Sequence, residues 1–173
     1  MSLDQRLKWL ADRVSVLESE KAISAVMHQY MRLCDQLTVG FDLAPLLSLF
    51  TEDAVWEGKG EKYEKTFGRI EGRQAIEKMF VKYTRPPAHF ALNIHFLSNE
   101  LIKVQGVQGQ GQWLLLQPST FANHTSQLSC ARIDADFVQT VHGWKISRFQ
   151  TESMFNRPMN APWNSAMSQP VPE

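Results

Sequence analysis

The sequence has few cysteines and no apolar run long enough to cross a membrane. Its two cysteines, Cys34 and Cys130, lie far apart among apolar neighbours and form no CxxC or Cys/His spacing. This predicts buried thiols in a reducing compartment rather than a disulfide framework. The first residues also lack the basic start and apolar core of a secretion signal. We therefore expect a cytoplasmic protein without a membrane partner.

Net charge and the common ligand motifs are missing too. Eighteen basic residues balance eighteen acidic ones, so nothing favours binding to nucleic acid. The chain has no glycine-rich phosphate loop, nucleophile elbow or dinucleotide fingerprint. His28, His124 and His142 show no ligand spacing with one another or with a cysteine. We expect no cofactor, no metal ion and no nucleic-acid partner.

The composition is that of an ordinary globular domain. With 43% hydrophobic and 21% charged residues, the 173-residue chain can bury a sizeable core. We expect one domain over residues 1–155, with a helical arm at about residues 3–18. Residues 156–173 are rich in proline, including Pro170 and Pro172, and lack periodicity. They predict an irregular tail, with Trp163 as a possible anchor.

Helical spacing begins near the N-terminus, and its apolar stripe changes face. Over residues 3–38, the apolar side chains from Leu7 to Leu17 lie on one side, and those from Ile23 onward lie on another. We therefore expect a break near residues 18–21, with Ser19 capping the second helix.

The remaining elements follow from spacing and turn residues. Asp42 is placed to cap a short helix with Pro45 in its first turn. The predicted order is that helix at 43–50, a strand at 54–57, a loop or irregular hairpin at 58–72, a helix at 73–83, and strands at about 89–104, 110–117, 127–140 and 144–152. Helices followed by strands predict an α+β fold, with helices on one face of a mostly antiparallel sheet.

Four ionisable side chains occupy positions where a core favours hydrocarbon: Tyr30, Asp35, His95 and Arg148. Arg148 is the clearest case, because it follows Trp144 and Ile146 on one face of a period-2 strand. Burying a charge is costly unless it is paired. If the four converge, they supply an acid, a base and a fixed positive charge, which suits proton transfer on a small organic molecule.

Each of these residues also has a purely structural interpretation. His95 is either a general base or a core histidine, and His89 has the same strand parity. Tyr30 lies on the apolar stripe as a core tyrosine would, and Arg148 pairs equally well with a neighbouring carboxylate. Asp35 lies about 140° round an ideal helix from Tyr30. Both can face one pocket only if the helix bends or ends nearby.

Three groups of short strings carry a family resemblance. Residues 30–35 (YMRLCD) and 46–56 (LLSLFTEDAVW) are similar to a helix, turn and first strand, and residues 67–76 (FGRIEGRQAI) to the start of a third helix. Residues 95–99 (HFLSN) and 143–148 (GWKISR) complete the set. Over about residues 10–155 the chain resembles the SnoaL-like branch of the nuclear transport factor 2-like superfamily. This implies a cone-shaped α+β fold with an internal pocket.

The resemblance also implies roles for the four residues. In dehydratase-like members, the histidine matched by His95 removes a proton, and the aspartate matched by Asp35 orients that histidine. Tyr30 and Arg148 match positions that hold the substrate oxygen. The sequence departs from the family pattern at Ile133, where relatives often have a tyrosine, and such a departure points to a different substrate or to no reaction.

Together these features predict a cofactor-independent lyase or isomerase, dehydratase-like, acting on a small, largely apolar cyclic or aromatic carbonyl compound. Its expected substrate-binding residues are Asn99, Trp56, Phe96 and Trp113, of which the three aromatic residues equally suit an ordinary core. The superfamily also includes polyketide cyclases and proteins without catalysis. The alternative is a non-catalytic binding or assembly module, or the small subunit of a ring-hydroxylating oxygenase.

An apolar arm and a broad sheet face also predict self-association. The apolar arm from Leu7 to Leu17 is expected to pack either on its own domain or on a neighbouring subunit. Asp134 and Asp136 alternate with apolar residues on a strand, as a solvated or subunit-facing surface would. We expect a homo-oligomer, either a dimer or a trimer.

Overall fold

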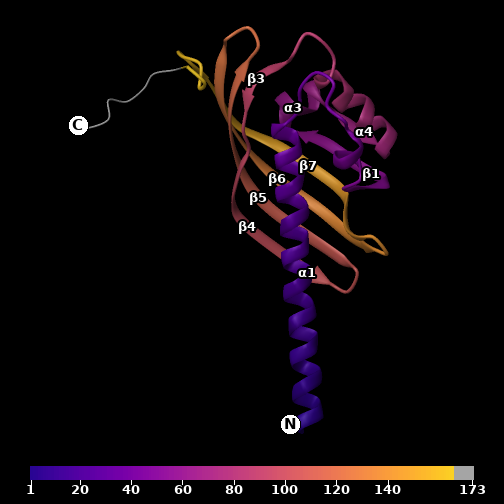
Figure 1. The fold of residues 1–173 in the computed structure, drawn as a ribbon. Coiled ribbons are helices and arrows are strands. Elements are labelled where there is room, and N and C mark those ends of the chain that lie inside the picture. Colours follow the sequence, from indigo (N-terminus) through magenta and orange to yellow (C-terminus); the bar gives the residue numbers. More distant parts are fainter. Residues whose placement is uncertain (166–173) are drawn as a thin grey trace, which may run out of the picture.

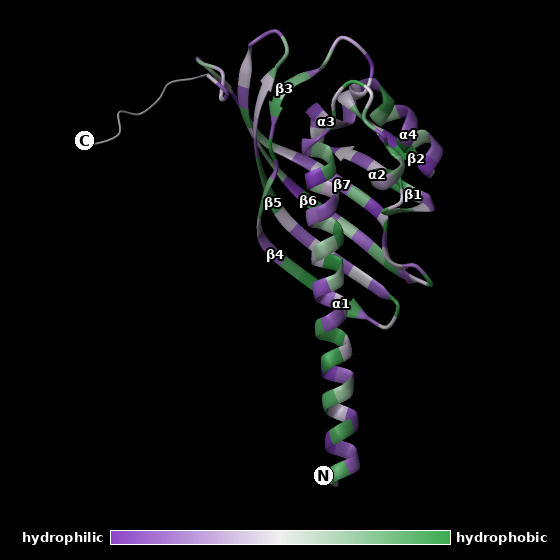
Figure 2. Cartoon of the chain, viewed as in Figure 1, coloured by the Kyte–Doolittle hydropathy of each residue, from purple (hydrophilic) through white to green (hydrophobic). Residues whose placement is uncertain are grey.

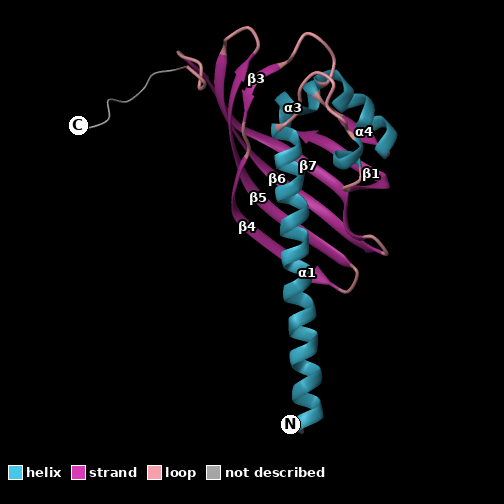
Figure 3. Ribbon diagram, viewed as in Figure 1, coloured by secondary structure: helices cyan, strands magenta, loops and turns pink. Residues whose placement is uncertain are grey.

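The computed structural model describes residues 1–165 as an α+β fold in which helices lie against one face of a curved sheet (Figure 1). The sheet has seven strands and is mostly antiparallel (Figure 3). The fold class expected from the sequence is confirmed. Pro170 and Pro172 of the expected tail lie outside the described residues. Among residues 1–165, no helix is both long and apolar enough to span a bilayer.

Helix α1 (Leu3–Asp35) is one continuous helix. Ser2 and Gln5 form a capping box at its start, in which each side chain accepts the backbone N–H of the other residue. The first half projects beyond the sheet, and the second half runs across the sheet's inner face (Figure 1). Sequence reasoning missed this cap because the apolar stripe begins only after it.

The expected break at residues 18–21 and the cap at Ser19 are wrong. These positions contain no glycine or proline, so the helical backbone continues through them. The apolar stripe changes face for another reason. Residues 1–18 are exposed, whereas the helix packs on the sheet from Ile23 onward.

A short helix leads from α1 into the sheet. Helix α2 (Ala44–Leu47) is shorter than the expected 43–50, and strand β1 (Phe50–Lys59) is longer than the expected 54–57. Oδ1 of Asp42 accepts the N–H of Ala44 at 2.9 Å, which holds the start of the helix.

Of the two alternatives expected at 58–72, a loop or an irregular hairpin, the structure shows the irregular hairpin. Helix α3 (Gly60–Thr66) is inserted between β1 and strand β2 (Arg69–Glu71), which pairs antiparallel with β1. Helix α4 (Arg73–Phe80) and the 3-10 turn η1 (Val81–Tyr83) then occupy the whole of the expected helix at 73–83.

The remaining strands are β3 (Phe90–Asn93), β4 (Phe96–Gln105), β5 (Gln108–Phe121), β6 (Ser126–Thr140) and β7 (Gly143–Met159). The sheet order is β2-β1-β7-β6-β5-β3, and β4 pairs with another part of β5. Strand β1 is parallel to β7, and the other pairs are antiparallel. The expected strand at 89–104 is therefore interrupted at Ile94 and His95.

A bulge in β7 changes which of its side chains face the helices. Asp136 of β6 pairs with Arg148, but the next residue, Phe137, pairs with Ile146, so β7 has one extra residue at Ser147. Ile146 before the bulge and Phe149 after it are both buried in the core. The inward side chains thus change from even to odd positions.

The irregular tail begins later than expected. Strand β7 continues to Met159, which pairs with Ser126, so residues 156–159 belong to the sheet. Trp163 then holds the chain against the sheet. Its backbone N–H donates to Oγ1 of Thr120 and its Nε1–H to the carbonyl oxygen of Gln127, both at 3.0 Å.

Candidate functional site

A cavity of about 140 Å³ lies between the end of α1, helices α3 and α4, and the inner face of the sheet. Most of its lining is aromatic or aliphatic. Its polar lining residues, apart from three tyrosines and Trp56, are Cys34, Asn93, His95, Gln117 and Thr151. No Lys, Arg, Asp or Glu of the described chain lines it. Such a lining suits a neutral and mainly apolar ligand.

His95 and Asp35 form a hydrogen-bonded pair at the cavity wall. Oδ1 of Asp35 lies 2.6 Å from Nδ1 of His95 and also accepts the backbone N–H of His95 at 2.9 Å. A carboxylate only accepts, so the neutral imidazole carries its proton on Nδ1 and keeps a lone pair on Nε2. Because Asp35 holds the Nδ1 edge and His95 lines the cavity, Nε2 is the nitrogen available to a ligand.

The chain brings these two residues together at the ends of regular elements. Asp35 is the last residue of α1. From the sequence, the helix has to bend or end near this point if Asp35 and Tyr30 are to face one pocket, and the helix does end there. His95 lies in the gap between β3 and β4, so its backbone N–H is free of the sheet ladder and can donate to Asp35. The side chains of His95 and Asp35 are 12% and 26% exposed, so water reaches the pair only partly.

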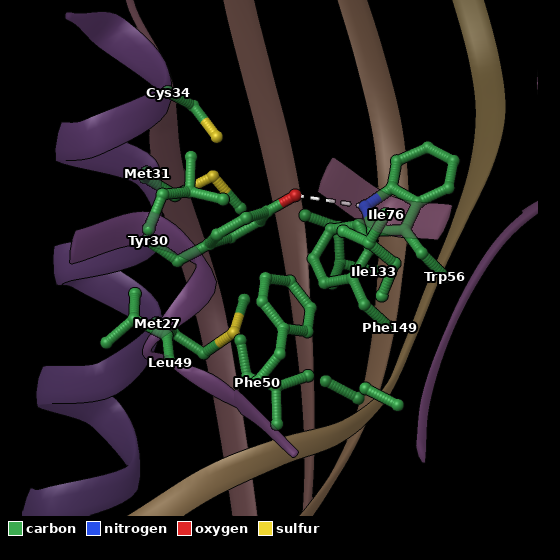
Figure 4. Close-up of a cluster of buried hydrophobic side chains, with 14 of the residues drawn as sticks. Met27, Tyr30, Met31, Cys34, Leu49, Phe50, Trp56, Ile76, Ile133 and Phe149 are labelled. Atoms are coloured by element: carbon green, nitrogen blue, oxygen red, sulfur yellow. Dashed lines mark hydrogen bonds between the residues drawn. The ribbon is translucent and has the colours of Figure 1, made fainter. Parts of the chain in front are cut away.

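Tyr30 also lines the cavity, and its hydroxyl oxygen accepts the Nε1–H of Trp56 at 3.0 Å (Figure 4). Burial raises the pKa of Tyr30 well above its usual value, so the phenol stays protonated and can act as a donor. Burial likewise raises the pKa of the neighbouring Cys34 thiol. A protonated thiol is a poor nucleophile, which argues against cysteine chemistry here.

Asn93 is a polar lining residue that sequence reasoning missed. It is buried, and its Oδ1 accepts from Nε2 of Gln117 and from Oγ of Ser119, each at 2.8 Å. These two bonds orient the amide so that Nδ2 remains as a donor. Asn93 lies two residues before His95, so strand parity was the signal that could have found it.

Arg148 does not reach the cavity, so its expected place beside His95 is wrong. The bulge at Ser147 turns it to the outer face of the sheet, where its guanidinium lies 2.6 Å from Glu57 and 3.5 Å from Asp136. It also contacts Gln150. The alternative interpretation, a structural pair with neighbouring carboxylates, is the one that the structure supports.

Three of the four expected substrate-binding residues also lie elsewhere. Phe96 is 55% exposed, because it follows His95 and points to the opposite face. Asn99 is exposed at an irregularity in the pairing of β4 with β5. Trp113 is buried in the core, where its Nε1–H donates to Glu100 at 2.9 Å. Trp56 is the one that lines the cavity.

The structure distinguishes the two candidate histidines. His89 precedes β3 and is exposed, with its ring against Tyr83, Phe90 and Phe121. It does not line the cavity, whereas His95 does. Of the two, only His95 contacts Asp35 among the described residues.

Two further groups of lining residues had no sequence signal. Tyr63 and Phe67 come from α3 and the residue after it, within the segment expected to be a loop or irregular hairpin with no helix in it. Phe149 and Thr151 face inward only because of the bulge in β7. Among residues 1–165, no group of three or more His, Cys, Asp or Glu side chains is placed to hold a metal ion.

Solved structures with a similar fold come from several proteins. They include a hexachlorocyclohexane dehydrochlorinase, LinA type 2, with a TM-score of 0.70 and 17% identity, covering 94% of this chain and 99% of that one. A candidate scytalone dehydratase from Novosphingobium aromaticivorans has a TM-score of 0.69 and 17% identity, over 87% and 96% of the two chains. A candidate aromatic ring hydroxylase from the same organism has a TM-score of 0.71 and 20% identity, over 83% and 94%. At these identities the similarity concerns the fold.

Comparison at the sequence level gives one family. No curated protein sequence matches this chain. The sequence pattern of the SnoaL-like domain matches residues 15–150, which run from the middle of α1 to Gln150 in the first half of β7. This range includes every residue of the cavity described above except Thr151. The chain therefore belongs to the SnoaL-like domain family.

Proposed function

We propose that this protein is a cofactor-independent lyase or isomerase that removes a proton next to a carbonyl group. The observation that carries the proposal is the contact of 2.6 Å between Asp35 and His95 at the wall of an apolar cavity. A half-buried carboxylate that fixes the tautomer of a histidine leaves the other ring nitrogen as a base at the wall of a cavity that water reaches only partly.

In the proposed reaction, Nε2 of His95 takes a proton from the carbon beside the carbonyl. The electron pair of the broken C–H bond moves towards the carbonyl oxygen, and the Asp35 carboxylate stabilises the imidazolium cation that forms. In one course the electron pair returns from the oxygen to form a carbon–carbon double bond while the C–O bond to a hydroxyl group on the next carbon breaks, and the imidazolium protonates the departing hydroxide to water. In the other course the imidazolium returns the proton to another carbon of the substrate. The first course is an elimination and the second shifts a double bond.

Neutral donors replace the cation that was expected to hold the substrate oxygen. With Arg148 on the outer face, the donors at the cavity include the Tyr30 hydroxyl and Nδ2 of Asn93. Both are oriented by hydrogen bonds from neighbouring side chains, so little reorganisation is needed when negative charge develops on the oxygen.

The cavity also limits the substrate. A volume of about 140 Å³ is close to that of an apolar cavity of about 150 Å³ that holds one benzene ring. Without a charged lining residue, the cavity favours a neutral compound of about one ring over an acid or a phosphate ester. Two similar folds belong to a dehydrochlorinase and a candidate dehydratase, whose names both describe eliminations. This agrees with the proposed reaction class.

The test is proton exchange in deuterated water with a panel of neutral one-ring ketones, followed by proton NMR on the dialysed protein. His95→Gln should slow exchange about 100-fold or more while ligand affinity changes little. His89→Gln is the matched control and should exchange as the wild type does. Equal exchange in wild type and His95→Gln would contradict the proposal. Equal binding with no exchange in either protein would instead support a binding module.

We also propose a cytoplasmic location, because both cysteines are free thiols in the described structure. Cell fractionation tests this, and recovery of the protein outside the cytoplasm would contradict it.

A further inference from the structure

The outer half of α1 is an apolar surface that its own domain does not cover. It projects beyond the sheet, and hydrophobic residues recur along its length among hydrophilic ones (Figure 2). Leu7, Leu10, Val14 and Leu17 are 55%, 50%, 51% and 55% exposed. Exposing such a row of side chains to water is unfavourable, and rows of this kind mark interaction sites.

The spacing of this row is that of a coiled coil. Leu3, Leu7, Leu10, Val14 and Leu17 alternate steps of four and three, which places Leu3, Leu10 and Leu17 at d and the other two at a. We call these five side chains the seam. A repeat of 3.5 residues suits pairing with another helix better than packing on a sheet, which uses a wider stripe. Lys21 occupies the next a position and ends the seam near the sheet.

The seam points away from the domain. At about 100° per residue, it lies roughly 135° round α1 from the face that carries Ile23, Met27 and Cys34 and packs on the sheet. Two helices joined along their seams would therefore each keep their own domain on the far side. A second copy of this chain can approach without meeting the sheet.

Charge selects the relative direction of two such helices. In a parallel pair, each g residue faces the e residue five positions further on in the other helix. Arg13 at g then faces the partner's Glu18 at e, twice by symmetry, and no like charges meet among the e and g residues. The two Lys21 side chains meet only at the a position that ends the seam. In the antiparallel pair that sets Leu10 beside the partner's Val14, Arg6 would face the partner's Glu20, but Arg13 would face the partner's Arg13, and Asp4 the partner's Glu18. The parallel arrangement avoids both repulsions.

We propose that the outer halves of α1 from two copies of this chain form a parallel two-stranded coiled coil, which makes the protein a homodimer. The apolar arm of one copy thus binds the identical arm of a second copy.

Sedimentation equilibrium of the full chain at micromolar concentration tests the proposal. The wild type should have about twice the chain mass of 19.8 kDa, and the double variant Leu10→Glu, Leu17→Glu should have the chain mass. Trp9→Glu is the matched control, because Trp9 is 55% exposed on the same arm but lies roughly 120° from the seam. It should remain dimeric. Circular dichroism confirms that each variant is folded.

Two more variants test the direction. Val14→Cys should form an intermolecular disulfide on mild oxidation, because only parallel pairing brings position 14 beside itself, and the wild type gives the background from native thiols. Arg13→Glu should weaken the dimer roughly tenfold, and adding Glu18→Arg should restore it. A monomeric or trimeric wild type, a dimeric double variant, loss of the dimer in Trp9→Glu, or no crosslink at position 14 would overturn the proposal.

Discussion

The inner face of the sheet has two regions, one packed solid and the other hollow. Near the middle of α1, Trp113 and Ile23 fill the space above two glycines of β5. A Cβ on Gly111 would lie 2.1 Å from the Trp113 ring, and one on Gly109 would lie 2.4 Å from Cδ1 of Ile23. The glycines therefore admit large side chains. We call this the packed region.

The hollow region lies at the other end of the sheet, around His95. There the Phe149 ring lies 5.0 Å from the Tyr30 ring and 5.5 Å from the Trp56 ring, measured between centroids, and these three residues line the cavity. Figure 4 shows the three rings side by side. Both regions use the same helix and neighbouring strands. The candidate site thus lies where a packed aromatic cluster borders an open space, and polar side chains, among them Asn93 and His95, line the same space.

The largest expected effect compares two buried tryptophans, one from each region. Trp113 and Trp56 are 2% and 6% exposed, and each donates its Nε1–H to a side chain. Trp113→Ala should lower the free energy of unfolding by about 3–5 kcal/mol, because it opens a new cavity. Trp56→Ala should cost clearly less, because it enlarges an existing one. Urea denaturation of both variants measures this, and equal losses would contradict the contrast between the regions.

The second prediction concerns the charged member of the site. Asp35→Asn should reduce the rate of proton exchange by about 100-fold, because the amide no longer fixes the Nδ1–H tautomer or stabilises the imidazolium of His95. The free energy of unfolding should change by about 1 kcal/mol. Asp134→Asn on the outer face is the matched control. A rate that falls equally in both variants would argue against a role for the pair.

The sequence predicted the architecture well and the register less well. The helix at 73–83 and the strands from 108 onward followed from periodicity, because these segments bury one face against the core. The break expected in α1 was wrong because a change of apolar face looks the same whether a helix ends or leaves its domain. Propensity at residues 18–21 favoured the continuous helix.

For the candidate site, the residues at element ends were predictable and those after an irregularity were not. The positions of His95 and Asp35 followed from the family resemblance, and the helix end explains how both can meet. Arg148 was misplaced because one extra residue at Ser147 reverses the faces of β7, and a bulge leaves no mark in hydrophobic alternation. Asn93 has the same strand parity as His95, and this parity is the sequence signal for its place at the cavity.

A third prediction sharpens the boundary of the hollow region. A Cβ on Gly58 would lie 2.5 Å from the backbone oxygen of Tyr63, so Gly58→Ala must displace α3, which supplies Tyr63 and Phe67 to the cavity. We expect a loss of about 1–3 kcal/mol in stability and weaker ligand binding. Gly106→Ala is the control, because its turn lies far from the cavity lining and its Cβ would meet nothing within 4 Å, although its φ of +59° adds some strain. Unchanged ligand affinity in Gly58→Ala would show that α3 does not shape the cavity.

The smallest expected effect comes from Arg148, on the outer face. Burial raises the pKa of Glu57, but hydrogen bonds from Arg148 and Arg69 outweigh it and hold that pKa below its usual value of 4.5. A lowered carboxyl pKa stabilises the fold above the unfolded-state pKa, and this stabilisation is lost as pH falls through the folded-state pKa. Arg148→Gln should therefore destabilise the protein by about 1 kcal/mol or less near pH 7, and by less still under acid conditions.

Arg148→Gln also separates the two faces of the sheet. Because its guanidinium contacts Glu57 and Asp136 on the outer face and lines no part of the cavity, the rate of proton exchange should equal that of the wild type. Denaturation at several pH values and NMR exchange on the same sample measure both quantities. A variant with wild-type stability but slowed exchange would mean that the bulge does not keep Arg148 away from the substrate, and the neutral donors Tyr30 and Asn93 would then not suffice to hold the oxygen.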